Sequence, residues 1–202
     1  MDDSAVGRNI NPLQPLLAGI FRIPERRVKL DPEDIRELFF DATERPTRRP
    51  EKGQREFYSG KKKRHTIKTQ VVVVCRTKPP GPGAKPRKLR IAAVSASSPG
   101  RVHDKKVDDR ARMVGPPDAK RTGDTAYLGT GLKTPTRKPR GGELSDRQKE
   151  ENRRVWRRRV AAEHGIGKMK VWRIASERYR NPVGKHTLIM KNVAGLHNLM
   201  YA

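Results

Sequence analysis

The chain has 202 residues, 33% hydrophobic and 34% charged, so its apolar core is expected to be small and surrounded by long polar segments. Lys and Arg number 47 against 22 Asp and Glu, a formal net charge of +25 that favours a polyanionic partner such as nucleic acid. The single cysteine, Cys75, excludes an internal disulfide framework and a zinc site built on paired cysteines, and no N-terminal apolar stretch is long enough for a signal peptide or a membrane span.

The positive charge has two other interpretations. A basic surface can keep a protein from aggregating, and it can also bind a membrane surface. The membrane interpretation is disfavoured because the sequence has no long amphipathic basic helix with a broad apolar face. Nucleic acid is therefore the favoured partner, bound through the release of counterions from phosphates.

The start of the chain predicts an arm followed by a strand. Residues 1–33 are of mixed composition, and their apolar piece at 16–21 lies between two prolines, which favours a short helix or an extended arm. Residues 34–40 end in three large apolar side chains and predict a buried strand with Asp41 at its C-terminal edge.

Two more strands are expected after a basic loop at residues 42–64. Residues 65–75 contain a run of valines without polar alternation, which predicts a strand buried on both faces. Residues 77–88 are rich in Pro and Gly and predict a turn, and residues 89–96 form the next strand. Because the links between these strands are not helical, we expect an antiparallel meander.

The middle of the chain is polar and rich in turns. Residues 103–114 predict a short polar helix, and residues 119–124 predict a short strand that ends on Asp124. Residues 130–143 contain many turn-forming residues, with one more short strand expected around 132–136.

The last third predicts a long helix. Residues 145–148 form a capping-box pattern, and helix-forming residues continue over 147–170. The tail is expected to close the core with a further helix from Gly184 onward. The apolar positions expected to face the sheet beside Glu163 are Trp156, Val160 and Ile166.

Three acids stand out by their positions. Asp41 and Asp124 follow predicted strands, and Glu163 lies on the helix stripe expected to face the sheet. Any one of them alone is better explained by a pair with one of the abundant arginines. As a set they favour convergence at one edge, because buried carboxylates need a partner or a metal, and divalent cations would neutralise their mutual repulsion.

Oxygen ligands of this kind suit Mg²⁺ or Mn²⁺. Two such ions about 4 Å apart can activate a water or a DNA 3′-hydroxyl and stabilise the leaving oxygen of a phosphodiester. The expected cofactor is therefore a divalent metal, as two ions.

Seven segments carry motifs in a recognisable order, and together they span most of residues 37–201. This ordered set resembles the DDE superfamily endonucleases of bacterial insertion-sequence transposases, in the group related to Harbinger elements. The segments are FFDATERP (39–46), FYSGKKKRHTIKTQVVV (57–73), SPGRVHD (98–104), GDTAYLG (123–129), NRRVWRRRVAAEHGIGKMKVWRI (152–174), RYRNP (178–182) and VAGLHNL (193–199).

The resemblance implies an α/β fold of the RNase H-like kind, a mixed sheet flanked by helices, here with extended basic loops. It also implies that the acids of the first, fourth and fifth motifs are the catalytic metal ligands, and these are Asp41, Asp124 and Glu163. The fourth motif has Ala126 where the family usually has Gly, and a methyl group there could misplace a tight turn.

Members of that family usually carry an N-terminal helical DNA-binding region, whereas 40 residues precede Asp41. We expect residues 1–33 to be a short N-terminal arm, either a remnant or a segment that depends on a partner, and residues 34–202 to be the RNase H-like catalytic domain. A fragment, the second frame of a split gene and a decayed copy all fit this arrangement.

Three further residues are candidates for support around the metal. His103 and Asp104 are sequence neighbours, and a supporting role or a fourth ligand is expected of them. His164 follows Glu163 but points to a different helix face, which favours support over direct ligation.

Two basic segments are candidates for DNA contact. The run KKKR at 61–64 is a solvated loop, a nuclear localisation signal or a phosphate-contacting hairpin, and its place before a core strand favours the hairpin. Arginines crowd the helix that carries Glu163 at i,i+4 spacing, which is easier to accommodate if phosphates lie along it. Trp156 and Trp172 are expected in the core. The residues expected to contact DNA are Lys61, Lys62, Lys63, Arg64, Arg153, Arg157, Arg158, Lys168 and Lys170.

The expected function is that of a transposase catalytic core, which hydrolyses phosphodiesters and transfers strands at the ends of a mobile element. Its expected partners are the element ends and target DNA, with an oligomer forming on DNA in the bacterial cytoplasm. The alternative is a catalytically decayed or incomplete transposase that only binds DNA, with salt-sensitive binding and no cleavage. A ribosome-associated role is a weaker third interpretation, because acids at strand ends do not fit it.

Overall fold

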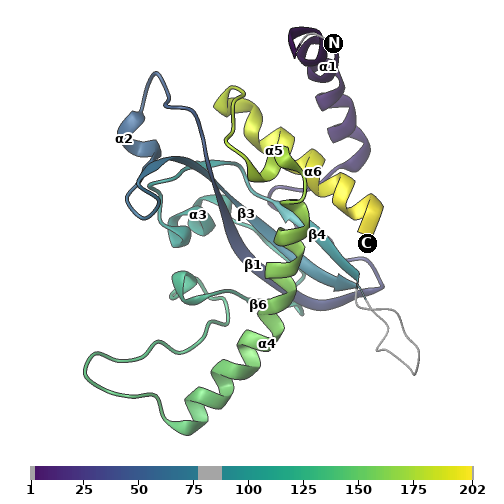
Figure 1. Ribbon diagram of the computed structural model, residues 1–202. Helices are drawn as coiled ribbons and strands as arrows, with labels where there is room; N and C mark the ends of the chain where they lie inside the picture. The colour runs from purple at the N-terminus through teal and green to yellow at the C-terminus, as the bar shows by residue number, and fades with distance from the viewer. Residues whose placement is uncertain (1–2, 77–87, 202) are drawn as a thin grey trace.

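The structure is a computed structural model that describes residues 3–76 and 88–201, with helices on both sides of a mixed sheet (Figure 1). The helices are α1 (Asp3–Phe21), α2 (Gln54–Phe57), α3 (Asp104–Ala111), η1 (Thr125–Tyr127), α4 (Asp146–Met169), α5 (Arg173–Ser176), η2 (Val183–Lys185) and α6 (His186–Tyr201). The strands are β1 (Asp34–Pro46), β2 (Tyr58–Ser59), β3 (Arg64–Arg76), β4 (Lys88–Val94), β5 (Ser98–Pro99) and β6 (Lys120–Thr122).

Strand β3 is the centre of the sheet. Its valine run at 71–74 is fully buried, because helices and loops cover both faces of the sheet. Antiparallel ladders join β3 to β1 and to β4, so Val73 lies between Phe39 and Ile91. This confirms the predicted meander. The turn predicted between β3 and β4 at 77–88 lies outside the described residues, apart from Lys88.

Strand β6 makes the sheet mixed, because it pairs in parallel with β1. The order across the main body is β4, β3, β1, β6, and the short strands β2 and β5 pair with the beginning of β3. A mixed sheet flanked by helices is the RNase H-like arrangement expected from the sequence. The short strand expected around 132–136 is instead a single bridge between Thr122 and Lys133.

Two apolar clusters hold the layers together. On one face, Phe39 and Val73 pack against Ala162 and Ile166 of α4 and against residues of α6. On the other face, residues of β1 and β3 pack against Ala111 at the end of α3 and against the segment 113–132. Alternate residues of β1 therefore point into different clusters, as the two-residue repeat of a strand requires.

Helix α4 begins with the predicted capping box, in which Ser145 and Gln148 exchange hydrogen bonds between side chain and backbone. Its orientation differs from the predicted one. Trp156 and Val160 are exposed, while Trp172 packs at the margin of the core as a partly buried residue. The residues of α4 that face the sheet are Val155, Arg159, Ala162, Gly165, Ile166 and Met169.

The N-terminal segment forms a longer helix than predicted. Helix α1 has 19 residues with two prolines inside it, and it lies beside α6 (Figure 1). The Asn192 amide of α6 donates to the Gln14 carbonyl oxygen at 2.9 Å, and Phe21 packs against Gly195. In the part of the chain that the structure describes, no helix combines the length and apolar character needed to cross a membrane.

Candidate active site

Asp41 lies within β1, at the point where this strand extends past its parallel neighbour. The β1–β6 ladder ends at the pair Phe39 and Thr122, and Asp41 and Asp124 each follow that pair by two residues. The two acids therefore lie next to each other at the same edge of the sheet. The prediction that Asp41 ends its strand was wrong, because β1 continues to Pro46 through pairing with β3.

A backbone amide holds each of these carboxylates. Asp41 Oδ1 accepts a hydrogen bond from the Ala42 N–H at 2.8 Å, and Asp124 Oδ1 accepts one from the Ala126 N–H, also at 2.8 Å. Asp124 thereby caps the short helix η1. The described non-glycine residues with positive φ do not include Ala126, so the turn after Asp124 accepts alanine without backbone strain.

Asp41 is in an environment that disfavours its charge. Burial raises the pKa of Asp41 to about 6 from an ordinary value of 3.8, and the negative charges of Asp124 and Asp104 raise it further. The amide of Ala42 and the guanidinium of Arg159 oppose this shift. The carboxylates of Asp41, Asp124 and Asp104 are thus close enough to interact electrostatically, and a cation placed among them would be stabilised.

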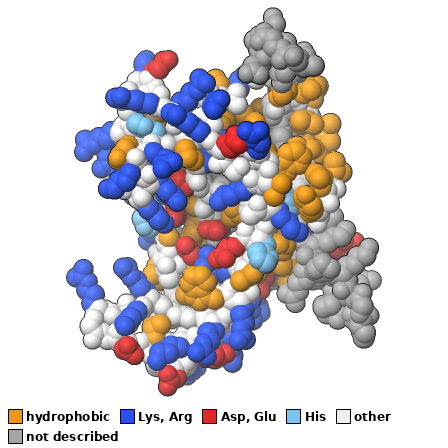
Figure 2. Space-filling model, in the orientation of Figure 1, with side chains coloured by type: hydrophobic (Ala, Val, Ile, Leu, Met, Phe, Trp, Pro, Cys, Tyr) orange, Lys and Arg blue, Asp and Glu red, His pale blue; other side chains and the backbone are white. Residues whose placement is uncertain are grey.

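The same three carboxylates also affect the pKa of Tyr127. Its side chain is 1% exposed, and burial raises the pKa of its phenol, with further contributions from Asp41, Asp104 and Asp124. Figure 2 shows acidic side chains gathered at the centre of this face, with Lys and Arg side chains around them. Acidic and basic side chains therefore share this face of the molecule.

Asp104 and His103, predicted as supporting residues, have different surroundings. Lys68 Nζ lies 3.0 Å from Asp104 Oδ1 and 3.9 Å from a Glu44 oxygen, so one ammonium group bridges two acids at the edge of the site. His103 is exposed and caps α3, because its Nδ1 accepts from the Lys105 N–H at 3.3 Å. The negative charge of Asp104 helps to raise the pKa of Asp41, whereas His103 caps helix α3.

Arg159 is the functional candidate that the sequence interpretation placed on the wrong face. The arginines that crowd its helix were expected as a group to face DNA, yet Arg159 is 4% exposed and its charge acts on Asp41. Its guanidinium carbon lies 5.3 Å from the centroid of the Trp156 ring. Glu163 follows one helical turn later on α4 and is exposed. The signal that identifies Arg159 is its spacing within the buried stripe Val155, Arg159, Ala162 and Ile166.

His164 lines a cavity that the three predicted acids do not line. Together with Arg157 and Arg158 it lines a cavity of about 650 Å³ between α4 and β1, whose inner wall includes Phe39. Asp41, Asp124 and Glu163 do not line this cavity. The structure thus gives His164 surroundings of its own, separate from the acidic centre.

The donors at the acidic centre fit a hard divalent cation in kind, since they are carboxylate oxygens. Within residues 3–76 and 88–201, no three His, Cys, Asp or Glu side chains are grouped closely enough to hold a metal ion. Asp41 and Asp124 lie at the same sheet edge, and the exposed Glu163 follows Arg159 by one turn of α4. Two of the three predicted acids are therefore brought together by the sheet itself.

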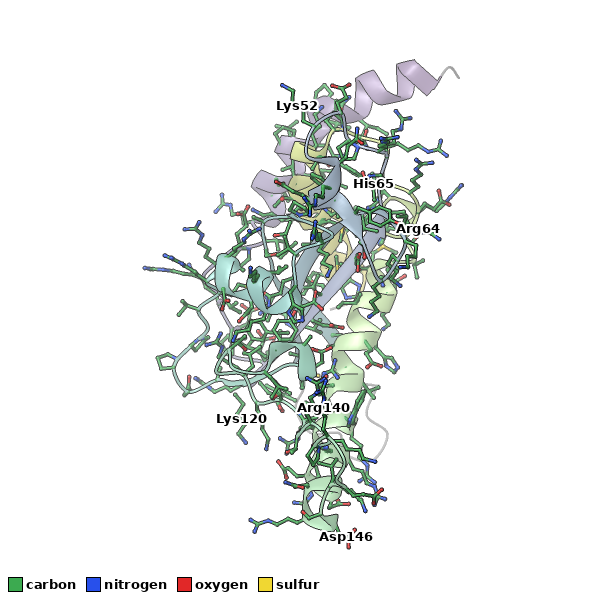
Figure 3. All side chains as sticks on the ribbon, turned by 90° about the vertical axis from the view of Figure 1, so that its left-hand side faces the viewer. Lys52, Arg64, His65, Lys120, Arg140 and Asp146 are labelled. Atoms are coloured by element: carbon green, nitrogen blue, oxygen red, sulfur yellow. The ribbon has the colours of Figure 1, made fainter. Side chains whose placement is uncertain are left out.

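The predicted DNA-contacting residues are all exposed. The run at 61–64 forms the turn of the β2–β3 hairpin, in which Ser59 pairs with Arg64. Figure 3 shows Arg64 and Lys52 toward one end of the molecule and Arg140 toward the other. Basic side chains therefore extend along the molecule on both sides of the acidic centre.

Comparisons with known proteins identify the family of the chain. A family profile described as DDE superfamily endonuclease matches residues 40–198. Over 206 residues the chain is 30% identical to a probable transposase for insertion sequence element IS702 from Microchaete diplosiphon, covering 98% of this chain and 70% of the relative. The chain therefore belongs to the DDE superfamily endonucleases and is an enzyme of the DDE transposase type. No solved structure gives a significant match.

Proposed function

We propose that this chain is the catalytic core of a DNA transposase that hydrolyses phosphodiesters and transfers strands at the ends of a mobile element. The observation that carries the proposal is the position of Asp41 beside Asp124, past the end of the β1–β6 ladder. The negative charge of Asp124 contributes to the raised pKa of the partly buried Asp41, and such a pair of carboxylates makes a centre for a divalent cation. The surrounding basic surface suits a DNA substrate.

Asp41, Asp124 and Glu163 would hold Mg²⁺ or Mn²⁺, as two ions. When bound, such ions activate the attacking water or 3′-hydroxyl and stabilise the leaving oxygen. The chain's own groups prepare the centre: the amides of Ala42 and Ala126 fix two carboxylates. The buried Arg159 offsets part of the negative charge on Asp41.

We propose that DNA contacts the positively charged parts of the surface. The exposed hairpin at 61–64 and the exposed basic residues of α4 would neutralise backbone phosphates on either side of the acidic centre. Asp104, whose charge acts on Asp41, would support the site without being a metal ligand. His103, which caps α3, and His164, which lines a different cavity, would not contact the metal. We further propose that the protein acts as an oligomer on DNA, with a helical DNA-binding partner or segment.

Two observations favour a second candidate function: Glu163 is exposed, and the described residues contain no group of three possible metal ligands. A protein with an incomplete triad would bind DNA through its basic surface and would not cut it. Its binding would weaken steeply with salt whether metal is present or not.

The discriminating experiment incubates the purified chain with Mg²⁺ or Mn²⁺ and DNA that carries the element ends, and follows strand cleavage. We expect metal-dependent nicking that falls to the metal-free level in Asp41→Asn and Glu163→Gln. The exposed Glu51 provides a matched control as Glu51→Gln, which should cleave normally. Binding without cleavage in every metal would favour the second candidate, and cleavage untouched by both substitutions would refute the catalytic assignment.

A further inference from the structure

Four arginines line a second cavity at the far end of β1, away from the acidic centre. Its volume is about 420 Å³, and its wall includes Arg45, Arg173, Arg178, Arg180 and Asn181. Three of the arginines and Asn181 are exposed, so the cavity opens to solvent, whereas Arg45 forms its buried part. The cavity therefore has a positively charged floor and a positively charged mouth.

Arg45 is a buried cation without an anionic partner. It is 3% exposed, and within the described residues no carboxylate lies at ion-pair distance from it. One amino group donates to the Ile174 carbonyl oxygen, and the guanidinium lies 4.8 Å from the centroid of the Tyr179 ring. Its Nε is buried and has no acceptor. These contacts orient the guanidinium but leave its charge uncompensated, which is costly unless an anion binds.

The neighbouring acid does not supply that anion. Glu177 lines the cavity, but its Oε1 accepts a hydrogen bond from Arg173 Nε at 2.6 Å, so these two charges compensate each other. Arg45, Arg178 and Arg180 remain as net positive charges around one cavity. Guanidinium groups match the oxygens of a phosphate through paired hydrogen bonds, which makes a phosphate the anion that this geometry favours.

The cavity is in line with the acidic centre along one strand. Arg45 follows Asp41 by four residues in β1, and both side chains lie on the same face because a strand alternates with a period of two. At about 3.3 Å per residue the separation along the strand is roughly 13 Å. A nucleic-acid strand has a phosphate about every 3.4 Å of helix axis, so the same DNA can reach both places.

We propose that the cavity formed by Arg45, Arg178 and Arg180 binds a backbone phosphate of the DNA whose neighbouring segment occupies the Asp41–Asp124 centre. This inference deepens the proposed function, and it rests on DNA being the substrate of that centre. The pocket holds the strand beyond the cleavage point, and Arg45 supplies the buried charge that a water-exposed arginine cluster lacks.

The test measures DNA binding by the full chain in a chelator, so that the result does not depend on metal chemistry. Arg178→Ala/Arg180→Ala removes two of the three exposed arginines that line the cavity, and Arg26→Ala/Arg110→Ala removes two exposed arginines elsewhere as a charge-matched control. The slope of log Kd against log salt should become shallower by about 1 in the pocket variant and remain unchanged in the control. Equal slopes for the two variants would overturn the proposal.

A second readout maps the pocket directly. Phenylglyoxal modifies accessible arginines, and mass spectrometry reports the extent at each position. A DNA duplex should protect Arg178 and Arg180 in the wild-type chain but leave Arg26 reactive. Protection by inorganic phosphate without protection by DNA would overturn the proposal. If DNA protects the pocket while the chain cleaves no DNA in any metal, the pocket stands and the proposed catalytic function fails. Normal cleavage with an unprotected pocket would support the catalytic function and overturn the pocket.

Discussion

Asp41 and Asp124 occupy matched positions, each two residues beyond the last pair of the parallel β1–β6 ladder, with Asp41 still in β1 and Asp124 in the segment that follows β6. Each carboxylate accepts one backbone N–H at 2.8 Å, which fixes one of its oxygens and leaves the other available. The position of Asp41 is fixed by its pairing within the sheet, where it lies opposite Val71 of β3. The mutual repulsion of these acids is thus built into the fold, and its consequences for stability can be measured.

Replacing Asp41 with Asn should stabilise the protein in the absence of metal. The folded-state pKa of Asp41 is raised from 3.8 to about 6, so the folded chain holds this proton more tightly than the unfolded chain does. The unfolding free energy therefore falls as pH rises through this interval, and above it the wild type carries a penalty. At pH 8 with a chelator, chemical denaturation should show Asp41→Asn to be more stable by on the order of 1–3 kcal/mol. Equal or lower stability of the variant would contradict the electrostatic description.

Acid should destabilise the fold through His186. Burial, aided by the charge of Arg45, lowers the pKa of His186 to about 3, while its ordinary value is 6.5. Between these two pKa values His186 binds a proton in the unfolded chain but stays neutral in the folded chain. The unfolding free energy therefore decreases as pH falls below 6.5. The Nδ1 atom lies 2.7 Å from Ser97 Oγ in a buried polar network. Urea unfolding from pH 7 to 4 should show a smaller loss in His186→Asn than in the wild type; parallel curves would exclude this origin.

Two glycines of α4 should respond in opposite ways to alanine. A Cβ at Gly165 would lie 2.9 Å from Val73 Cγ1, and this branched, buried neighbour cannot swing aside. Gly165→Ala should therefore lower the unfolding free energy by about 1–3 kcal/mol, less the gain in helix propensity. Gly167 has nothing within 4 Å, so Gly167→Ala should raise it by about 0.5–1 kcal/mol. Thermal unfolding of the two variants provides the comparison, and a shift of the same sign in both would show the close packing at Gly165 to be wrong.

The hairpin turn at 61–64 should contribute to DNA affinity through charge alone. Lys61→Ala/Lys62→Ala removes two exposed ammonium groups and should make the salt dependence of DNA binding shallower by up to about 2. The same change is expected for any DNA sequence, because phosphate contacts carry no base preference. Lys29→Ala/Lys106→Ala removes equal charge at other exposed positions. The hairpin has no special role if both pairs change the slope by the same amount.

The sequence predicted the strongly patterned parts of the fold. The valine run of β3 and the capping box at Ser145 carry their own local signals, and both were confirmed. The length of β1 was underestimated, because the polar residues after Asp41 remain in the strand only through pairing with β3, a non-local cause. A local pattern cannot reveal such pairing.

The candidate site was predicted in part for a similar reason. The parallel register of β1 and β6 brings Asp41 and Asp124 together, and each acid was identified from the end of an apolar or strand-like run. The orientation of α4 was misjudged because Trp156 and Val160 are as apolar as residues that do face the sheet, and the buried face also includes the charged residue Arg159. The buried face includes Gly165, where α4 packs closely on β3, and Arg159, whose charge acts on Asp41.

The most direct test of the central claim is the binding of Mn²⁺ to the metal-free protein, followed by calorimetry or by the loss of the free-ion electron paramagnetic resonance signal. The wild type should bind Mn²⁺, Glu51→Gln should bind it equally, and Asp41→Asn and Asp124→Asn should each lose the binding. Undiminished Mn²⁺ binding in both aspartate variants would contradict a metal centre built on the edge shared by β1 and β6.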